Sequence, residues 1–385
     1  MSRATLEVSM IVKNGAATLQ RALASVASVA DRILVGDTGS EDATADVARH
    51  AGAEVIEVPW ENDFSRARNH LLAAARCDWI LVLDADEMFD PTGPALLTAL
   101  LNKPKADAYD IVRWNYVRSA NLRSGDNPPL PNPRILPAAN AYPAYALSLN
   151  TRLFRRHPGV YFEGAVHETV ADRIDHLGLK RIPANFVLHH LGQAEDEERV
   201  RNTKNEFYFK LGLQKIKAQP KNAAAWFEVG LTELEHYKHP SEALLYFEQA
   251  RALSPADARS RLFSGICLTA LGRLPEAMAR LREAFGLGMC SPVLFEAIGD
   301  VYFQSGHYEL ARDAYQKGSI SPLNQAKLGA CEALTGESSQ GLSRIQDAIR
   351  RCPEFTELKD ILKAATKECR RPRLVRTATP QTTTL

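Results

Sequence analysis

The chain has 385 residues, of which 45% are hydrophobic and 24% charged, and its formal net charge is +1. This length suits two domains better than one core, and the charge balance lacks the basic excess of a nucleic-acid-binding protein. No run of about eighteen apolar residues occurs, the first apolar run is too short for a signal peptide, and the cysteines form no C-x-x-C pair. We therefore expect a cytoplasmic protein with reduced thiols and no transmembrane segment, disulfide framework or zinc site.

The first 117 residues alternate strand-like and helix-like segments. Short β-branched runs, which predict strands, stand at 7–12, 32–36, 53–58, 78–83 and 109–117. Apolar residues at helical spacing separate them, so the order predicts βαβ units and a mostly parallel sheet. Such sheets bind ligands beyond the carboxyl ends of their strands. Polar segments follow three of these strands: "VKNG" (12–15), "VGDTGSEDAT" (35–44) and "VLDADE" (82–87).

The next hundred residues are less regular. Residues 118–150 are rich in proline and predict a long surface loop. Strands are expected at 150–156 and 185–192, with a turn leading into a helix at 162–178 between them. A charged amphipathic helix at 194–218 then links this portion to the rest of the chain.

Small residues recur at a fixed period after Pro220. Gly230, Gly265 and Gly299 are separated by 35 and 34 residues, and an alanine series keeps the same step. Small side chains at this period let the two helices of a unit approach closely, and the units stack because one alone cannot bury its apolar face. The pattern resembles tetratricopeptide repeats and predicts about four units over 220–355, with an unrelated helical bundle as the alternative. The tail, 370–385, lacks apolar periodicity and is predicted to be disordered.

The segment "VLDADE" places three carboxylates within four positions, directly after an apolar strand. A solvated loop is the ordinary explanation of an isolated acidic triplet. At the edge of a parallel sheet, however, carboxylate oxygens suit Mg²⁺ or Mn²⁺, which are typically held by one or two carboxylates plus substrate phosphates. The order Asp84-x-Asp86 therefore suggests a nucleotide diphosphate held through a metal ion.

Four blocks around this loop resemble the family 2 glycosyltransferases with the GT-A fold, in particular the bacterial branch that carries tetratricopeptide repeats. The blocks are "SMIVKNG" (9–15), "VGDTGSEDAT" (35–44), "PWENDFSRARNHLL" (59–72) and "DWILVLDADE" (78–87). Looser similarity extends to 152–156, 162–168 and 190–192. The resemblance implies an α/β, Rossmann-like GT-A domain over 1–218, followed by an all-α repeat solenoid. Within that domain it implies a nucleotide-sugar half at 7–117, an acceptor half at 118–192 and the linking helix at 194–218.

The resemblance also implies which residues bind the nucleoside of the donor. Asp37 corresponds to the carboxylate that hydrogen-bonds the base and the ribose. Val12, Lys13 and Asn14 lie where the family lines the base pocket, although Lys13 departs from the proline or threonine that is more common there.

A second set of residues is implied for the diphosphate and the metal. Arg68 is expected to face the diphosphate or the ribose, and Asn69 to fix the loop beneath it. Asp84, followed by Ala85, is expected to contact the ribose or a metal-bound water, and Asp86 to ligate the metal directly. His190 matches a histidine that completes the metal site in many GT-A enzymes, while a structural histidine at a strand end is the alternative.

Inverting transfer needs a base that takes the proton of the acceptor. Glu168, in "AVHE" (165–168), falls where the resemblance puts the acceptor-side acidic residue. The alternative is that Glu168 merely sits favourably in the first turn of a helix. His167 is open to three readings: a base, a contact to the donor phosphate, or a packed core imidazole.

Together these features predict a metal-dependent, inverting glycosyltransferase that uses a nucleotide-sugar donor, with UDP favoured over GDP by resemblance alone. Peptide, lipid-linked sugar and glycan acceptors all fit, and so do glucose, galactose and N-acetylglucosamine as the donated sugar. We expect the repeats to present a polypeptide acceptor or to join two subunits. The alternative is a non-catalytic nucleotide-sugar-binding scaffold that acts through its repeats. A glycoside hydrolase fits poorly, because it needs carboxylates on opposite sides of a sugar.

Overall fold

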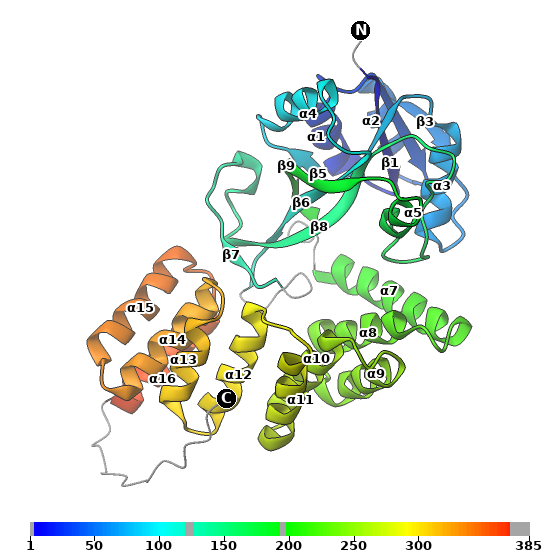
Figure 1. Ribbon diagram of the computed structural model, residues 1–385. Helices are drawn as coiled ribbons and strands as arrows, with labels where there is room; N and C mark the ends of the chain where they lie inside the picture. The colour runs from blue at the N-terminus through cyan, green and yellow to red at the C-terminus, as the bar shows by residue number, and fades with distance from the viewer. Residues whose placement is uncertain (1–3, 120–126, 193–197, 370–385) are drawn as a thin grey trace.

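The computed structural model describes residues 4–119, 127–192 and 198–369, which form a sheet-containing part followed by a helical part (Figure 1). The described strands build a nine-stranded sheet in the order β3-β2-β1-β4-β8-β6-β9-β5, with β7 paired to β8 at the side. The predicted fold class, an α/β domain followed by an all-α array, is confirmed. The predicted tail, 370–385, and the start of the predicted linking helix lie outside the described residues.

The first four paired strands are parallel: β1 (Leu6–Val12), β2 (Arg32–Asp37), β3 (Glu54–Glu57) and β4 (Trp79–Val82). The helices between them are α1 (Ala16–Val26), α2 (Thr44–His50) and α3 (Phe64–Ala74). Every residue of β4 is buried, as expected for an apolar run in the interior of a sheet covered on both faces. The carboxyl ends of β1, β2 and β4 therefore meet at one edge.

The rest of the sheet is mixed. It contains β5 (Glu87–Phe89), β6 (Ala108–Val117), the short β7 (Leu130–Pro131), β8 (Ala144–Arg155) and β9 (Arg181–His190), and α4 (Gly93–Asn102) connects β5 to β6. Strand β8 runs antiparallel to β4 and β6, whereas β9 runs parallel to β6 and antiparallel to β5. The sheet is thus parallel across its first four strands and mixed beyond them.

Two local expectations were wrong. Strand β8 begins at Ala144, so the end of the proline-rich stretch predicted as loop is strand, with a 3-10 turn at Pro137–Ala139 before it. At 162–178, where a turn leading into a helix was predicted, the helix is shorter than expected and is limited to α5 (Ala171–His176). The residues before α5 form a loop instead, because Gly164 and His167 both have positive φ angles, 100° and 55°, which a right-handed helix does not accommodate.

The helical part starts with α7 (Glu198–Ala218), and four helix pairs follow in the described chain. These are α8 (Ala223–Thr232) with α9 (Pro240–Leu253), α10 (Ala258–Ala270) with α11 (Leu274–Gly286), α12 (Pro292–Gln304) with α13 (Tyr308–Gln316), and α14 (Pro322–Thr335) with α15 (Ser338–Arg351). A π-helical turn, Glu233–Tyr237, extends α8. A last helix, α16 (Thr356–Cys369), packs beyond residue 355, where the array was predicted to end. Proline stands in the first turn of α9, α11, α12 and α14, where its missing N–H costs nothing.

The periodic glycines lie where paired helices touch. A Cβ atom added to Gly230 would stand 2.8 Å from the Phe247 ring, and one added to Gly265 would stand 2.6 Å from Leu281. At Gly299 the distance to the Tyr315 ring would be 2.5 Å. The close approach that the period predicted is confirmed.

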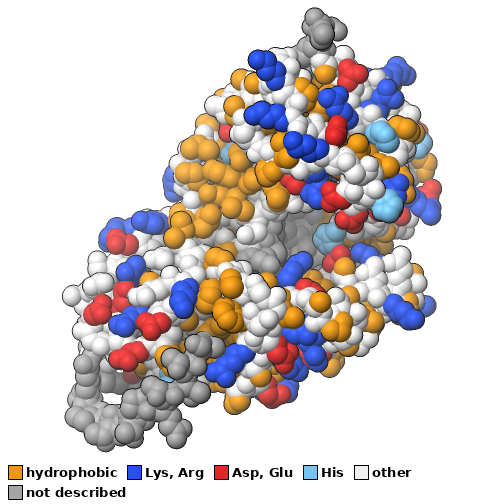
Figure 2. Space-filling view, viewed as in Figure 1, with side chains coloured by type: hydrophobic (Ala, Val, Ile, Leu, Met, Phe, Trp, Pro, Cys, Tyr) orange, Lys and Arg blue, Asp and Glu red, His pale blue; other side chains and the backbone are white. Residues whose placement is uncertain are grey.

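The array contacts the sheet-containing part at both of its ends. At one end, the α7 rings of Phe207 and Tyr208 lie against Trp60 and Phe64. At the other end, Val117 of β6 and Ala144 of β8 share a buried cluster with residues of α14, α15 and α16. Between these contacts the surface is hollowed (Figure 2). In the part of the chain that the structure describes, no helix combines the length and apolar character needed to cross a bilayer.

Candidate active site at the carboxyl edge of the sheet

The acidic loop, Asp84–Glu87, joins β4 to β5 through a tight turn. The Glu87 backbone N–H donates to the Asp84 carbonyl at 3.0 Å, and the Asp84 N–H donates to the Glu87 carboxylate, also at 3.0 Å. The turn separates Asp86, which faces His190, from Asp84 and Glu87, which share arginine partners. The triplet is therefore not a solvated loop.

Asp84 is held by arginines. Arg68 Nη2 lies 2.6 Å from Asp84 Oδ1, and Arg152 Nη2 lies 2.9 Å from Oδ2, with Arg113 more distant at 3.8 Å. Burial opposes the charged carboxylate, but the guanidinium groups of Arg152 and Arg68 outweigh it and hold the pKa of Asp84 well below its ordinary value. Asp84 stays ionised, with Arg68 as a direct neighbour.

Glu87 is fully buried, so its negative charge also needs positively charged partners. Arg113 Nη1 lies 2.9 Å from its Oε1, and Arg152 Nη2 lies 3.5 Å away. Arg113 comes from β6 and Arg152 from β8, the antiparallel strand beside it. Sequence reasoning missed both arginines. The signal that could have found them is a basic residue inside a segment predicted as buried strand, since such a charge requires a carboxylate partner.

Asp86 faces His190. Its Oδ2 lies 3.4 Å from His190 Nε2, while His190 Nδ1 lies 2.8 Å from Asn115 Oδ1. Burial works against a charged imidazole, yet the Asp86 carboxylate outweighs it and raises the pKa of His190. Asn115, which sequence reasoning missed, orients the ring so that Nε2 points at the carboxylate.

This pair fits a divalent metal ion. A carboxylate oxygen and an imidazole nitrogen, with an outer hydrogen bond that fixes the ring, are a common donor set for Mn²⁺. Among the described residues no three His, Cys, Asp or Glu side chains gather as metal ligands. Asp86 and His190 would therefore supply two positions and leave the others to phosphate oxygens or water.

The loops after β1 and β2 lie at the same edge. Val12 and Asp37 are register partners at the ends of these strands. Asp37 Oδ1 accepts hydrogen bonds from the backbone N–H groups of Gly39 (3.1 Å) and Ser40 (2.8 Å). Asn14, at a φ of 52°, accepts the Glu41 N–H at 2.8 Å.

Lys13 is exposed in the loop after β1, whereas Val12 is buried. A Cβ atom added to Gly15 would stand 3.4 Å from Ala85 of the acidic loop. The structure thus brings the residues predicted to line the base pocket close to the acidic loop.

Glu168 and His167 lie in the loop before α5. Glu168 Oε1 accepts from Arg68 Nε at 2.6 Å, so Arg68 bridges Glu168 and Asp84. The first-turn explanation of Glu168 is wrong, because α5 begins only at Ala171. His167 is exposed, which excludes a packed core imidazole.

Helix α3 holds this loop in place. Asn69 exchanges two hydrogen bonds with the backbone of Phe162, at 2.9 and 2.7 Å. The backbone N–H of Phe64 donates to the Ala165 carbonyl at 2.9 Å. The position of Glu168 is therefore tied to the helix that carries Arg68.

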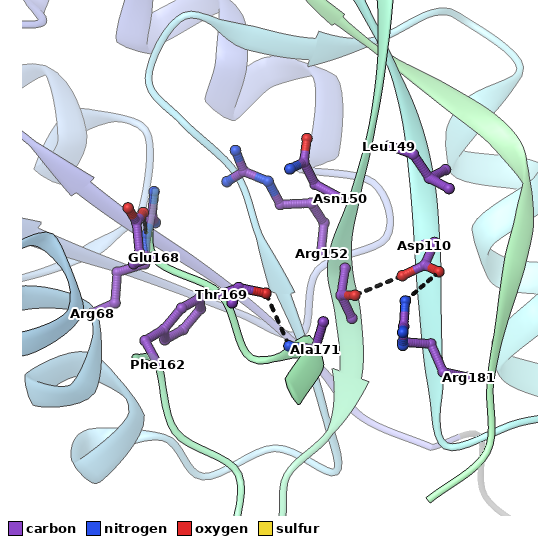
Figure 3. Close-up of a pocket in the computed structure, with 11 residues that line it drawn as sticks. Arg68, Asp110, Leu149, Asn150, Arg152, Phe162, Glu168, Thr169, Ala171 and Arg181 are labelled. Carbon is purple, nitrogen blue, oxygen red and sulfur yellow. Dashed lines mark hydrogen bonds and ion pairs between the residues drawn. The ribbon is translucent and has the colours of Figure 1, made fainter. Parts of the chain in front are cut away.

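A cavity of about 150 Å³ opens beside Glu168. Figure 3 shows Phe162, Glu168 and Thr169 on one side of it and residues of β8, including Asn150 and Arg152, across from them. The ion pair of Asp110 with Arg181, at 2.7 Å, closes its far end. Glu168 thus faces both the arginine network and an open space.

These observations define a class: an α/β domain with an anion- and metal-compatible site at the carboxyl edge of its sheet, joined to a helical-repeat array. Residues 7–157 match the model of glycosyl transferase family 2, and residues 237–285 match a tetratricopeptide repeat model. The chain therefore carries a family 2 glycosyltransferase domain followed by tetratricopeptide repeats.

Two curated relatives match parts of this chain. A TPR repeat-containing protein of Synechococcus elongatus is 34% identical over 208 residues, which is 52% of this chain and 45% of that protein. The prophage-derived glycosyltransferase SunS of Bacillus subtilis is 24% identical over 248 residues, 64% of this chain and 53% of that protein. The chain spans about half the length of these relatives. A solved TPR protein of Thermus thermophilus aligns with a TM-score of 0.37 at 16% identity, over 43% of this chain and 93% of its own.

Proposed function

We propose that this protein is a metal-dependent, inverting glycosyltransferase that transfers a sugar from a UDP-sugar to an acceptor. The observation that carries the proposal is the Asp86–His190 pair, 3.4 Å apart, beside the loops of Asp37 and Asp84 at one sheet edge. In this scheme the loops after β1 and β2 bind the nucleoside. Asp86 and His190 hold Mn²⁺ or Mg²⁺, which when bound neutralises the charge developing on the departing diphosphate.

Glu168 is the proposed base. Its carboxylate is oriented by Arg68 at 2.6 Å and faces the cavity, so an acceptor hydroxyl or other nucleophile placed there can deliver its proton to Glu168. Arg68 then serves to fix the carboxylate. The cavity is also where the acceptor displaces water, which would otherwise compete for the sugar.

The acceptor is proposed to be a polypeptide. The helical array flanks the hollow between the two parts of the molecule, and repeat arrays offer concave surfaces suited to extended chains (Figure 2). Self-association through the array is the alternative role for the repeats. The cytoplasmic location stays a prediction.

The decisive experiment is a calorimetric titration of UDP, with and without Mn²⁺ and with GDP as control, into the unmodified chain and an Asp86→Asn variant. The unmodified chain should bind UDP in preference to GDP, and only with the metal. Asp86→Asn should lose metal-dependent binding and at least about 100-fold in turnover, because a ligand is removed. Asp46→Asn, on an exposed residue of α2, is the matched control.

Two outcomes contradict the proposal. Full turnover of Asp86→Asn removes the assigned metal role. If neither nucleotide binds, the chain is instead a scaffold that acts through its repeats, and the internal neutralisation of Asp84 by arginines would then be a purely structural feature.

A further inference from the structure

The helix that begins the repeat-bearing region packs against the start of α3, the helix that carries Arg68. The ring of Tyr208, on α7, lies 5.9 Å from the ring of Phe64. Trp60 and Phe207 complete this aromatic cluster, with Trp60 packed edge-on to Phe64 at 4.8 Å. The cluster fastens α7 to the start of α3.

Helical geometry places Tyr208 on the side of α3 that carries Arg68. Phe64 and Arg68 are four residues apart on α3, so their side chains share one face of the helix. Phe64 also binds the Ala165 carbonyl, close to Glu168. A ring packed on Phe64 therefore lies on the side of α3 that faces Arg68 and Glu168.

The electrostatics of the phenol agree with this placement. Burial raises the pKa of Tyr208 to about 12, and the charges of Asp84, Glu168 and Asp86 add to the effect. These carboxylates belong to both sides of the proposed reaction, the donor side and the acceptor side. Tyr208 as a whole residue remains 37% exposed, so a ligand can reach it.

The group that must lie between the two sets of carboxylates is the sugar in transit. We infer that Tyr208 contacts the hexopyranosyl ring of the bound nucleotide sugar, so that α7 completes the transferase site. This inference rests on the proposed function. An aromatic ring with a polar tip suits a pyranose, which offers a C–H face to the ring and hydroxyls to the phenol.

The test compares UDP with UDP-sugars, which differ from it only by the sugar. With Mn²⁺ present, the affinities for UDP and for UDP-glucose, UDP-galactose and UDP-N-acetylglucosamine are measured for the unmodified chain and for Tyr208→Leu. Leucine keeps apolar packing on Phe64 while removing the ring. The best UDP-sugar should bind about tenfold more weakly to the variant, while the affinity for UDP is unchanged. Tyr246→Ala, which removes a half-buried helical tyrosine packed on Trp226 at 6.1 Å, is the control and should change neither affinity.

A second measurement needs no variant. In hydroxyl-radical footprinting of the unmodified chain, the UDP-sugar should protect the peptide that contains Tyr208, and UDP alone should not. The inference is overturned, while the proposed function stands, if Tyr208→Leu keeps the same ratio of the affinities for UDP and for the best UDP-sugar. It is also overturned if UDP and the UDP-sugar give the same footprint. If the unmodified chain binds neither UDP nor any of the UDP-sugars, the proposed function itself fails.

Discussion

The three carboxylates of the acidic loop have two kinds of partner. Asp84 and Glu87 share Arg113 and Arg152, whereas Asp86 faces His190. Burying an unpaired charge is costly, so the network stabilises the loop only while each partner is present.

Arg113→Met should destabilise the protein by about 3 kcal/mol, because it removes the nearest cation from the fully buried Glu87. Chemical denaturation followed by circular dichroism measures the free energy of unfolding. Arg49→Met, which breaks an exposed pair with Asp46, is the matched control and should change it by no more than about 0.5 kcal/mol. Equal effects of the two substitutions would show that the Glu87 network does not hold the loop.

Residue types and family resemblance together located only part of this site. Asp86, His190 and Glu168 stand in recognisable blocks, and the structure places them at one edge. Arg113, Arg152 and Asn115 could not be assigned, because their partners lie on other strands or loops and their pairing depends on strand order. Sequence spacing carries no information about which strands become neighbours across a mixed sheet.

At the scale of elements, the strands and helices that could be predicted were those whose sequences repeat at a regular spacing. The parallel strands and the helix pairs were expected because their apolar residues or glycines recur regularly. The loop before α5 was missed, since the left-handed backbone of His167 is set by the surrounding contacts rather than by its residue type. Strand β8 is longer than predicted, because the prolines before it favoured a loop up to residue 150.

The helix pairs should be sensitive to a single methyl group. Gly299→Ala would place a Cβ atom 2.5 Å from the Tyr315 ring, so we expect a loss of about 1–3 kcal/mol in the free energy of unfolding. Gly286→Ala, at the end of α11 with nothing within 4 Å, should be neutral or slightly stabilising. Thermal unfolding of both variants measures the contrast, and a neutral Gly299→Ala would mean that α12 and α13 are not in close contact.

At the scale of the whole molecule, the far end of the array is buried against the sheet. Cys352, at the end of α15, is fully buried with its Sγ 3.5 Å from the Pro143 carbonyl. Burial raises the pKa of Cys352 to about 11 and that of Cys267, in the middle of the array, to about 12. Both thiols are therefore poor nucleophiles near neutral pH.

Alkylation at pH 8, read by peptide mass spectrometry, should label the exposed Cys290 first and Cys352 only as slowly as Cys267. Slow labelling is expected because both buried thiols need an opening of the structure before they react. Early labelling of Cys352 alone would show that the end of the array separates from the sheet.

The two contacts between array and sheet have a mechanical consequence. A repeat array with a free end can bend without moving the domain beside it, whereas this array is held at both ends by contacts with the sheet-containing part. One of these contacts is made by α7, which carries Tyr208, and the other is the buried cluster that includes Val117 and Ala144. A change in the curvature of the array must therefore displace one of these two contacts. A partner that bends the array should therefore also displace α7, the helix that carries the proposed sugar contact Tyr208.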